Sequence, residues 1–164
     1  GSNAASGHHW PDDTRLKPGD CILVDIGCTW EGYCSDMTRT FFYKNVTQHQ
    51  QEVYHTVLKA NEEAEKAVTP GIPLSSLDQI ARGIITDKGY GSAFTGHFIG
   101  LEDHEFGDVS SASADRAVPG NIFSIEPGVY LENDMGVRVE DLVLVTDHGH
   151  EILNHFSKEL TVID

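Results

Sequence analysis

Four acidic residues occupy segments of the chain that otherwise have the pattern of β-strands. They are Asp25, Asp36, Glu126 and Glu140. An unpaired carboxylate is costly to bury, so each acid needs arginine, backbone N–H donors or a metal ion as a partner. Arginine is scarce and is limited to Arg15, Arg39, Arg82, Arg116 and Arg138. A metal ion would satisfy the acids economically, whereas a strand end in water would explain any one of them alone.

A histidine in a glycine-rich segment is the next candidate for chemistry. His97 lies in segment 95–100 (TGHFIG), where glycine permits a close approach of the backbone around it. His104 follows seven residues later. A single histidine is more often a satisfied structural side chain than a ligand, but its combination with several strand acids favours a metal site. The histidines near 147–151 indicate only a solvated hairpin turn.

Two strands must position the first pair of acids. Residues 21–27 (CILVDIG) predict a strand that is apolar on both faces, and therefore central and buried. The glycines over 27–32 predict a turn, and residues 36–43 (DMTRTFFY) predict a second strand antiparallel to the first. Asp25 then lies inside the first strand and Asp36 at the start of the second.

Two helices follow these strands. A capping-box signature at 47–50 (TQHQ) precedes apolar residues at helical spacing, and 70–71 (PG) ends this helix. Ser75 or Ser76 is the expected N-cap of a second helix, which ends at Gly89.

Further strands complete the predicted architecture. Residues 121–126 and 137–145 read as strands, and they carry Glu126 and Glu140. Because strands come first, then helices, then strands again, we expect an α+β domain. The helices should pack on one face of a mainly antiparallel sheet.

The amino-acid composition excludes some classes of binding partner for this chain. It has 164 residues, enough for one domain, and a formal net charge of −15, which argues against nucleic acid and anionic membrane surfaces. No apolar stretch approaches the ~20 residues that cross a bilayer. Cys21, Cys28 and Cys34 are odd in number, which favours reduced thiols in a cytoplasmic protein over a disulfide framework.

Five segments together resemble the pita-bread metallopeptidases, which include prolidase, aminopeptidase P, methionine aminopeptidase and creatinase. The segments are 24–27 (VDIG), 35–40 (SDMTRT), 96–105 (GHFIGLEDHE), 125–128 (IEPG) and 136–141 (GVRVED). The resemblance implies the pita-bread fold, with a curved sheet. It also implies a dinuclear metal site whose ligands are Asp25, Asp36, His97, Glu126 and Glu140.

The implied ligand set has a definite chemistry. One imidazole and four carboxylates make a hard, oxygen-rich site that suits Mn²⁺, and also Co²⁺, Zn²⁺ or Fe²⁺, rather than Cu(I). Two such ions would activate a water and polarise a peptide carbonyl. By resemblance, Glu126 is also the general base, His104 stabilises the tetrahedral intermediate and His8 contacts the substrate. On an alternating strand Arg138 and Glu140 share a face, so two roles are open for Arg138, which either orients Glu140 or holds the substrate.

Some features depart from the family. Proline-specific members usually carry a histidine four residues before the ligand histidine, and this chain has Ala93 there. Family catalytic domains also extend further towards the N-terminus. We therefore expect residues 1–164 to be the ligand-bearing C-terminal portion of a longer domain, with apolar faces covered by a homodimer or an N-terminal segment. Residues 1–4 (GSNA) fit either a tag remnant or the native family pattern upstream of His8.

The expected function is metal-dependent hydrolysis of short peptides by an Xaa-Pro aminopeptidase or dipeptidase. One alternative is creatinase-like hydrolysis of a C–N bond in a non-peptide substrate, which Ala93 leaves open. Another is a catalytically silent pita-bread module that binds peptides or proteins. A third, an acidic cation-binding protein without chemistry, predicts no requirement for His104. The presence of all five ligand types favours the enzyme.

Overall fold

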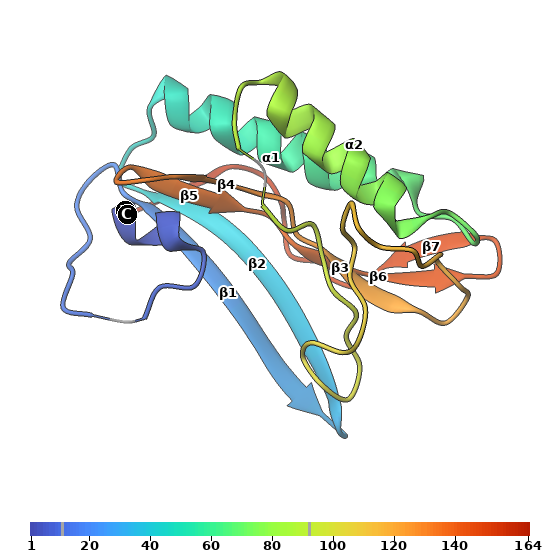
Figure 1. Ribbon diagram of the computed structural model, residues 1–164. Coiled ribbons are helices and arrows are strands. Elements are labelled where there is room, and N and C mark those ends of the chain that lie inside the picture. The colour runs from blue at the N-terminus through green and yellow to red at the C-terminus, as the bar shows by residue number, and fades with distance from the viewer. Residues whose placement is uncertain (11, 92) are drawn as a thin grey trace.

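Two helices cover one face of a curved set of strands in the computed structural model, which describes residues 1–10, 12–91 and 93–164 (Figure 1). This arrangement confirms the predicted α+β fold. The elements in chain order are η1 (Ser2–Ser6), β1 (Cys21–Trp30), β2 (Tyr33–Tyr43), α1 (Gln48–Ala67), α2 (Leu74–Asp87), β3 (Ile122–Ile125), β4 (Gly128–Leu131), β5 (Met135–Arg138), β6 (Asp141–Thr146), β7 (Gly149–Ile152) and β8 (Thr161–Ile163).

The strands form small sheets that are mainly antiparallel, as predicted. Their orders are β1-β2-β8, β3-β6-β7 and β4-β5, and β8 joins β2 in parallel. The β1–β2 hairpin is long and curved, and its tip points away from the helices (Figure 1). Its register pairs Asp25 with Thr38 and Gly27 with Asp36, so both acids lie in the middle of the hairpin.

The prediction that residues 21–27 form a central, buried strand is wrong. In the part of the chain that the structure describes, β1 lies at the edge of its sheet and has β2 as its neighbour. Its residues are exposed from Asp25 onward, and Ile26 is 56% exposed. A run of β-branched residues predicts a strand, but the neighbours that would bury it are set by tertiary structure.

Helix α1 begins as the sequence predicts. The Thr47 Oγ1 accepts the N–H of Gln50, and the Gln50 side chain accepts the N–H of Thr47, which completes the capping box. The buried apolar side chains of both helices form one core with the strands. They include Val53, Val57, Ala60 and Ala64 of α1, Leu77, Ala81 and Ile85 of α2, and Phe123, Ile125, Val137 and Val143 of the strands.

Helix α2 begins earlier than predicted. Its N-cap is Pro73 and its first residue is Leu74, so neither Ser75 nor Ser76 caps it. The reason is a tertiary contact, because the Leu74 N–H donates to the carbonyl of Asp115 at 3.0 Å. This bond satisfies a helix N–H that a serine cap would otherwise serve.

The strand predicted over 137–145 is broken in two. β5 ends at Arg138 and pairs with β4, whereas β6 begins at Asp141 and pairs with β3. Glu140 lies in the break, where its N–H donates to the Thr38 carbonyl at 3.1 Å. The chain therefore changes sheets at the position of the last predicted acid.

Two simpler observations bear on the sequence-based expectations. Cys21, Cys28 and Cys34 are free thiols, so the structure contains no disulfide among them. No helix of the described residues is long and apolar enough to cross a membrane. The cytoplasmic location, the homodimer and the longer parent domain stay predictions.

Candidate metal centre

All five predicted ligands line one cavity of about 740 Å³. The cavity opens beside the β1–β2 hairpin, and its walls also include the ends of β3 and β5 and the segment that carries His97. The fold thus brings together residues that are far apart in the sequence. The predicted site residues on its wall are Asp25, Asp36, His97, Glu126, Glu140, His8, His104 and Arg138.

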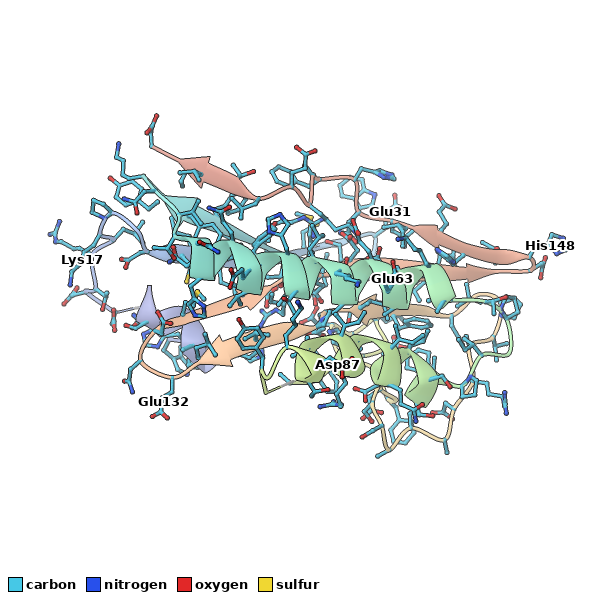
Figure 2. The ribbon with its side chains drawn as sticks, turned by 90° about the horizontal axis from the view of Figure 1, so that it is seen from above. Lys17, Glu31, Glu63, Asp87, Glu132 and His148 are labelled. Carbon is cyan, nitrogen blue, oxygen red and sulfur yellow. The ribbon has the colours of Figure 1, made fainter. Side chains whose placement is uncertain are left out.

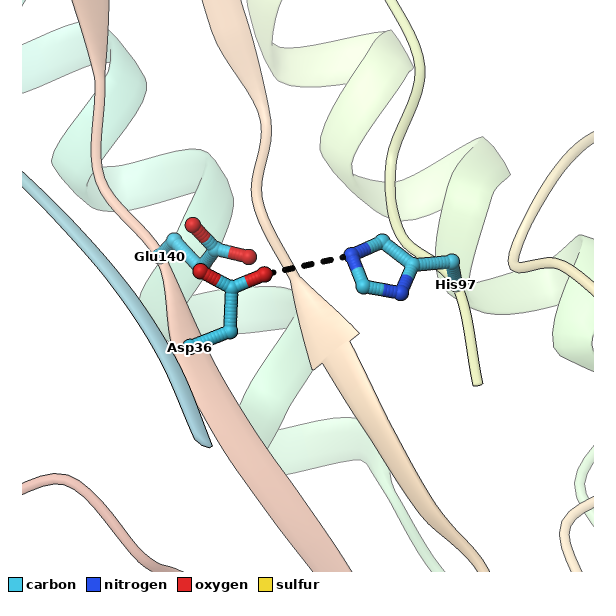
Figure 3. Close-up of side chains that lie close together, drawn as sticks. All are labelled: Asp36, His97 and Glu140. Carbon is cyan, nitrogen blue, oxygen red and sulfur yellow. Dashed lines mark ion pairs between the residues drawn. The ribbon is translucent and has the colours of Figure 1, made fainter. Parts of the chain in front are cut away.

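Three of the predicted ligands form a tight, buried group. Asp36, His97 and Glu140 each offer an atom within 4.8 Å of the others (Figure 3). The His97 Nε2 lies 3.4 Å from Asp36 Oδ2 and 3.3 Å from Glu126 Oε1. Asp25 and Glu126 lie on the same wall but outside the tight group.

The backbone around His97 is held against β3. The Ser124 N–H donates to the His97 carbonyl at 2.8 Å, and the Ser124 hydroxyl accepts the His97 N–H and donates to Glu126 Oε1, each at 2.9 Å. A Cβ at Gly96 would lie 2.0 Å from the Ser124 carbonyl oxygen. The close approach that the glycines predicted is therefore present, and Ser124 links two of the predicted ligands.

The orientation of the His97 ring suits a metal ligand. Its Nδ1 lies 3.1 Å from the Phe98 carbonyl oxygen, which can only accept, so Nδ1 is the protonated nitrogen in this bond. Nε2 then faces the acids and is the nitrogen that would bind a metal.

Glu140 is the most unusual acid of the site. It is 1% exposed, and its Oε1 has no hydrogen-bond partner among the described residues. Its other oxygen, Oε2, accepts the Thr38 hydroxyl at 2.6 Å. Burial, together with the charges of Glu126 and Asp36, raises the pKa of Glu140 to about 9.

Burial and neighbouring charges also shift the pKa values of other groups of the site. Partial desolvation raises the pKa of the Asp25 carboxyl, and burial raises the pKa of Glu126. Burial opposes the charge of His97, but its bond to Asp36 and the nearby glutamates raise the pKa of its imidazole to about 9. Asp36 is the exception, because His97 outweighs burial and lowers its pKa.

A divalent cation fits these observations. Four acids and one imidazole line the cavity, the buried Glu140 Oε1 at this site lacks a hydrogen-bond partner among the described residues, and the donor set is that of a hard metal. Divalent cations would also offset the negative charges of the carboxylates.

Arg138 is buried and its guanidinium is engaged on three sides. It is 2% exposed, and its Nη2 pairs with Asp25. Its Nε donates to the Thr38 hydroxyl at 3.0 Å, and its Nη1 donates to the Tyr130 hydroxyl at 2.8 Å. Of the two roles that the sequence left open, these contacts favour orientation of the acids.

Two polar residues of this group were not found from the sequence. Thr38 and Tyr130 both contact Arg138. Thr38 had a signal that could have revealed it, because it lies two residues after Asp36 on a strand and so shares its face. Tyr130 had none, since its strand, β4, was not predicted as a separate element.

The remaining predicted residues lie at the mouth of the cavity. The His104 ring stacks on the His97 ring with centroids 3.6 Å apart and an interplanar angle of 12°. His8 is exposed on the part of the wall that the N-terminal segment forms. Ala93 and Phe94 also line the cavity, and Phe94 is 42% exposed.

Comparison with known proteins agrees with this geometry. Residues 1–147 match metallopeptidase family M24. The chain belongs to this family. The fold is that of the pita-bread members.

Several M24 relatives are similar over nearly all of this chain. A prolidase from Thermococcus sibiricus is 37% identical with a TM-score of 0.96, and 99% of this chain covers 45% of that chain. An X-Pro aminopeptidase from Thermotoga maritima is 35% identical with a TM-score of 0.94, with 99% and 47% covered. An uncharacterized peptidase from Staphylococcus aureus is 47% identical over 161 residues, with 96% and 46% covered. This M24 chain thus spans just under half the length of these relatives.

Proposed function

We propose that this chain carries the metal centre of a peptidase that hydrolyses short peptides with two divalent ions, Mn²⁺ foremost. The observation that carries the proposal is the unpartnered Glu140 Oε1, buried beside Asp36 and His97. Such an oxygen needs a cation or a donor, and two further acids line the same cavity. The proposed ligands are Asp25, Asp36, His97, Glu126 and Glu140.

In this proposal, different residues of the chain have different roles in peptide hydrolysis. When bound, two divalent ions would supply an activated water and polarise the scissile carbonyl. Glu126 Oε1, held by the Ser124 hydroxyl, would take a proton from the attacking water and pass it to the leaving amine. His104, stacked on His97 and open to solvent, would donate to the oxyanion that forms on the substrate. His8, on the part of the cavity wall formed by the N-terminal segment, would contact the substrate.

Xaa-Pro peptides are the proposed substrates, for an aminopeptidase or a dipeptidase. The support is similarity to the prolidase and the X-Pro aminopeptidase named above, together with a cavity large enough for a short peptide. Ala93 favours a second candidate, creatinase-like hydrolysis of a C–N bond in a non-peptide substrate. This residue lines the cavity where proline-specific relatives usually present a histidine.

Metal analysis followed by a paired assay tests the proposal. The protein is loaded with Mn²⁺ and assayed with Xaa-Pro dipeptides and longer Xaa-Pro peptides, beside Glu126→Gln. The variant should lose about 10²- to 10⁴-fold in kcat. Glu132→Gln changes an exposed acid at the surface (Figure 2) and should match the wild type.

Three results distinguish the candidate functions. Protein without bound metal, or equal activity in wild type and Glu126→Gln, would overturn the proposal that the protein is an enzyme. Metal binding without hydrolysis of any peptide, but with cleavage of a small C–N substrate, would favour the second candidate. Metal binding with no hydrolysis at all would indicate a silent binding module.

A further inference from the structure

A threonine hydroxyl joins two of the most buried charged groups of the site. Thr38 is fully buried, and it lies between Arg138, which is 2% exposed, and Glu140, which is 1% exposed. The Arg138 Nε lies 3.0 Å from Thr38 Oγ1, which lies 2.6 Å from Glu140 Oε2. The three side chains form a continuous, buried hydrogen-bonded chain.

The direction of this chain is determined by chemistry. A guanidinium can only donate, so Thr38 Oγ1 accepts from Arg138. The single proton of the hydroxyl is then free for Glu140 Oε2, the other polar atom at hydrogen-bond distance. Because the bond runs this way, Oε2 must be an unprotonated oxygen. A proton on Glu140 would have to sit on Oε1, the oxygen without a partner.

The backbone on both sides of Glu140 is already held. Its N–H donates to the Thr38 carbonyl at 3.1 Å, and its carbonyl accepts Arg39 Nη1 at 2.6 Å. The principal freedom left to the residue is rotation of its side chain. A hydroxyl that binds one carboxylate oxygen removes that freedom and leaves the other oxygen, which is buried without a partner among the described residues, available to a cation.

We infer that Thr38 is a positioning residue, whose hydroxyl aims Glu140 Oε1 at the metal centre. The inference rests on the proposed function, since it assumes that a cation binds there. The same arginine pairs with Asp25 through Nη2. The contacts therefore run from Asp25 through Arg138 and Thr38 to Glu140, and they fix two of the proposed ligands relative to each other. Removing a hydrogen bond that orients a metal-ligating side chain commonly weakens metal affinity by about 10–100-fold.

Paired substitutions separate the hydroxyl from the shape of the side chain. Thr38→Val keeps the shape and removes the hydroxyl, whereas Thr38→Ser keeps the hydroxyl. Mn²⁺ affinity of EDTA-treated protein is measured by titration calorimetry. Thr38→Val should bind Mn²⁺ about 10–100-fold more weakly than wild type, and Thr38→Ser should stay within about threefold.

Thr40 provides a matched control on the same face of β2. It is also buried, but its hydroxyl donates to the Arg138 carbonyl at 2.9 Å and accepts the Arg138 N–H at 3.2 Å, and it has no carboxylate partner among the described residues. Thr40→Val should lower the stability to urea and leave Mn²⁺ affinity within threefold of wild type. If Thr38→Val does not fold, Thr38→Ala removes the same hydroxyl and is judged by the same criteria.

The outcomes distinguish this inference from the proposed function. Wild-type affinity retained in Thr38→Val, or an equal loss in Thr38→Ser or Thr40→Val, would overturn the positioning role while the metal centre stands. A wild-type protein that binds no divalent ion would overturn the proposed function and, with it, this inference.

Discussion

Replacing Glu140 with glutamine should stabilise the metal-free protein at neutral pH. Burial and neighbouring acids raise the pKa of Glu140 from 4.5 to about 9. At pH 7 the folded protein therefore holds a proton that the unfolded chain releases. At about 1.4 kcal/mol per pH unit over the interval from 4.5 to 7, this costs on the order of 3 kcal/mol. Glutamine does not ionise, so Glu140→Gln should recover most of this free energy.

The pH dependence has a definite sign. An acid whose pKa is raised by folding contributes stability that is present below pH 4.5 and is lost as the pH rises towards about 9. The raised pKa of His97, also about 9, acts in the same direction above its ordinary value of 6.5. Urea denaturation in EDTA from pH 5 to pH 9 should show wild-type stability falling with pH. The stability of Glu140→Gln should also fall with pH, but less steeply, because His97 still titrates in this variant.

Adding Mn²⁺ should reverse the order of stability. In the proposed function the metal would replace the proton on Glu140, so wild type should gain stability and release protons on binding, whereas Glu140→Gln should gain much less. Glu132→Gln removes an exposed carboxylate and should follow wild type throughout. A metal-free Glu140→Gln protein no more stable than wild type at pH 7, with an unchanged slope, would refute the reasoning.

Two further substitutions test how the site is held. Gly96→Ala should destabilise the protein by about 1–3 kcal/mol and weaken Mn²⁺ binding, because its Cβ would lie 2.0 Å from the Ser124 carbonyl oxygen; unchanged urea denaturation would contradict this. Asp78→Ala should cost about 3 kcal/mol in the same assay. Asp78 is fully buried, pairs with Arg82 and accepts the Thr95 hydroxyl at 2.7 Å, and a loss below ~1 kcal/mol would show that the pair is dispensable.

The helices and strands themselves could be predicted from local sequence patterns. The distant residues that contact them could not. The capping box at Thr47 depends on residues three apart, so it formed as predicted. The N-terminus of α2 depends on the Asp115 carbonyl, and the break before β6 depends on contacts to β2. These partners lie tens of residues away in the chain, where local pattern carries no information about them.

The roles of Arg138 show the same limit at the site. Alternation on one continuous strand predicted that it shares a face with Glu140. The strand is broken, and the two side chains meet through Thr38 instead. The pairing of Arg138 with Asp25 on β1 favours orientation of the acids, and only the folded hairpin shows this pairing.

The sequence by itself determined which side chains are available for chemistry. Acids in apolar strand segments and a glycine-flanked histidine are costly unless they share a cation, and that cost can be read from residue types alone. Tertiary structure decided what the residue types leave open. It placed Glu140 at a change of sheets, left its Oε1 without a partner among the described residues and turned its Oε2 to Thr38. Such contacts depend on the packing of distant strands, and a linear pattern does not encode the distance between them.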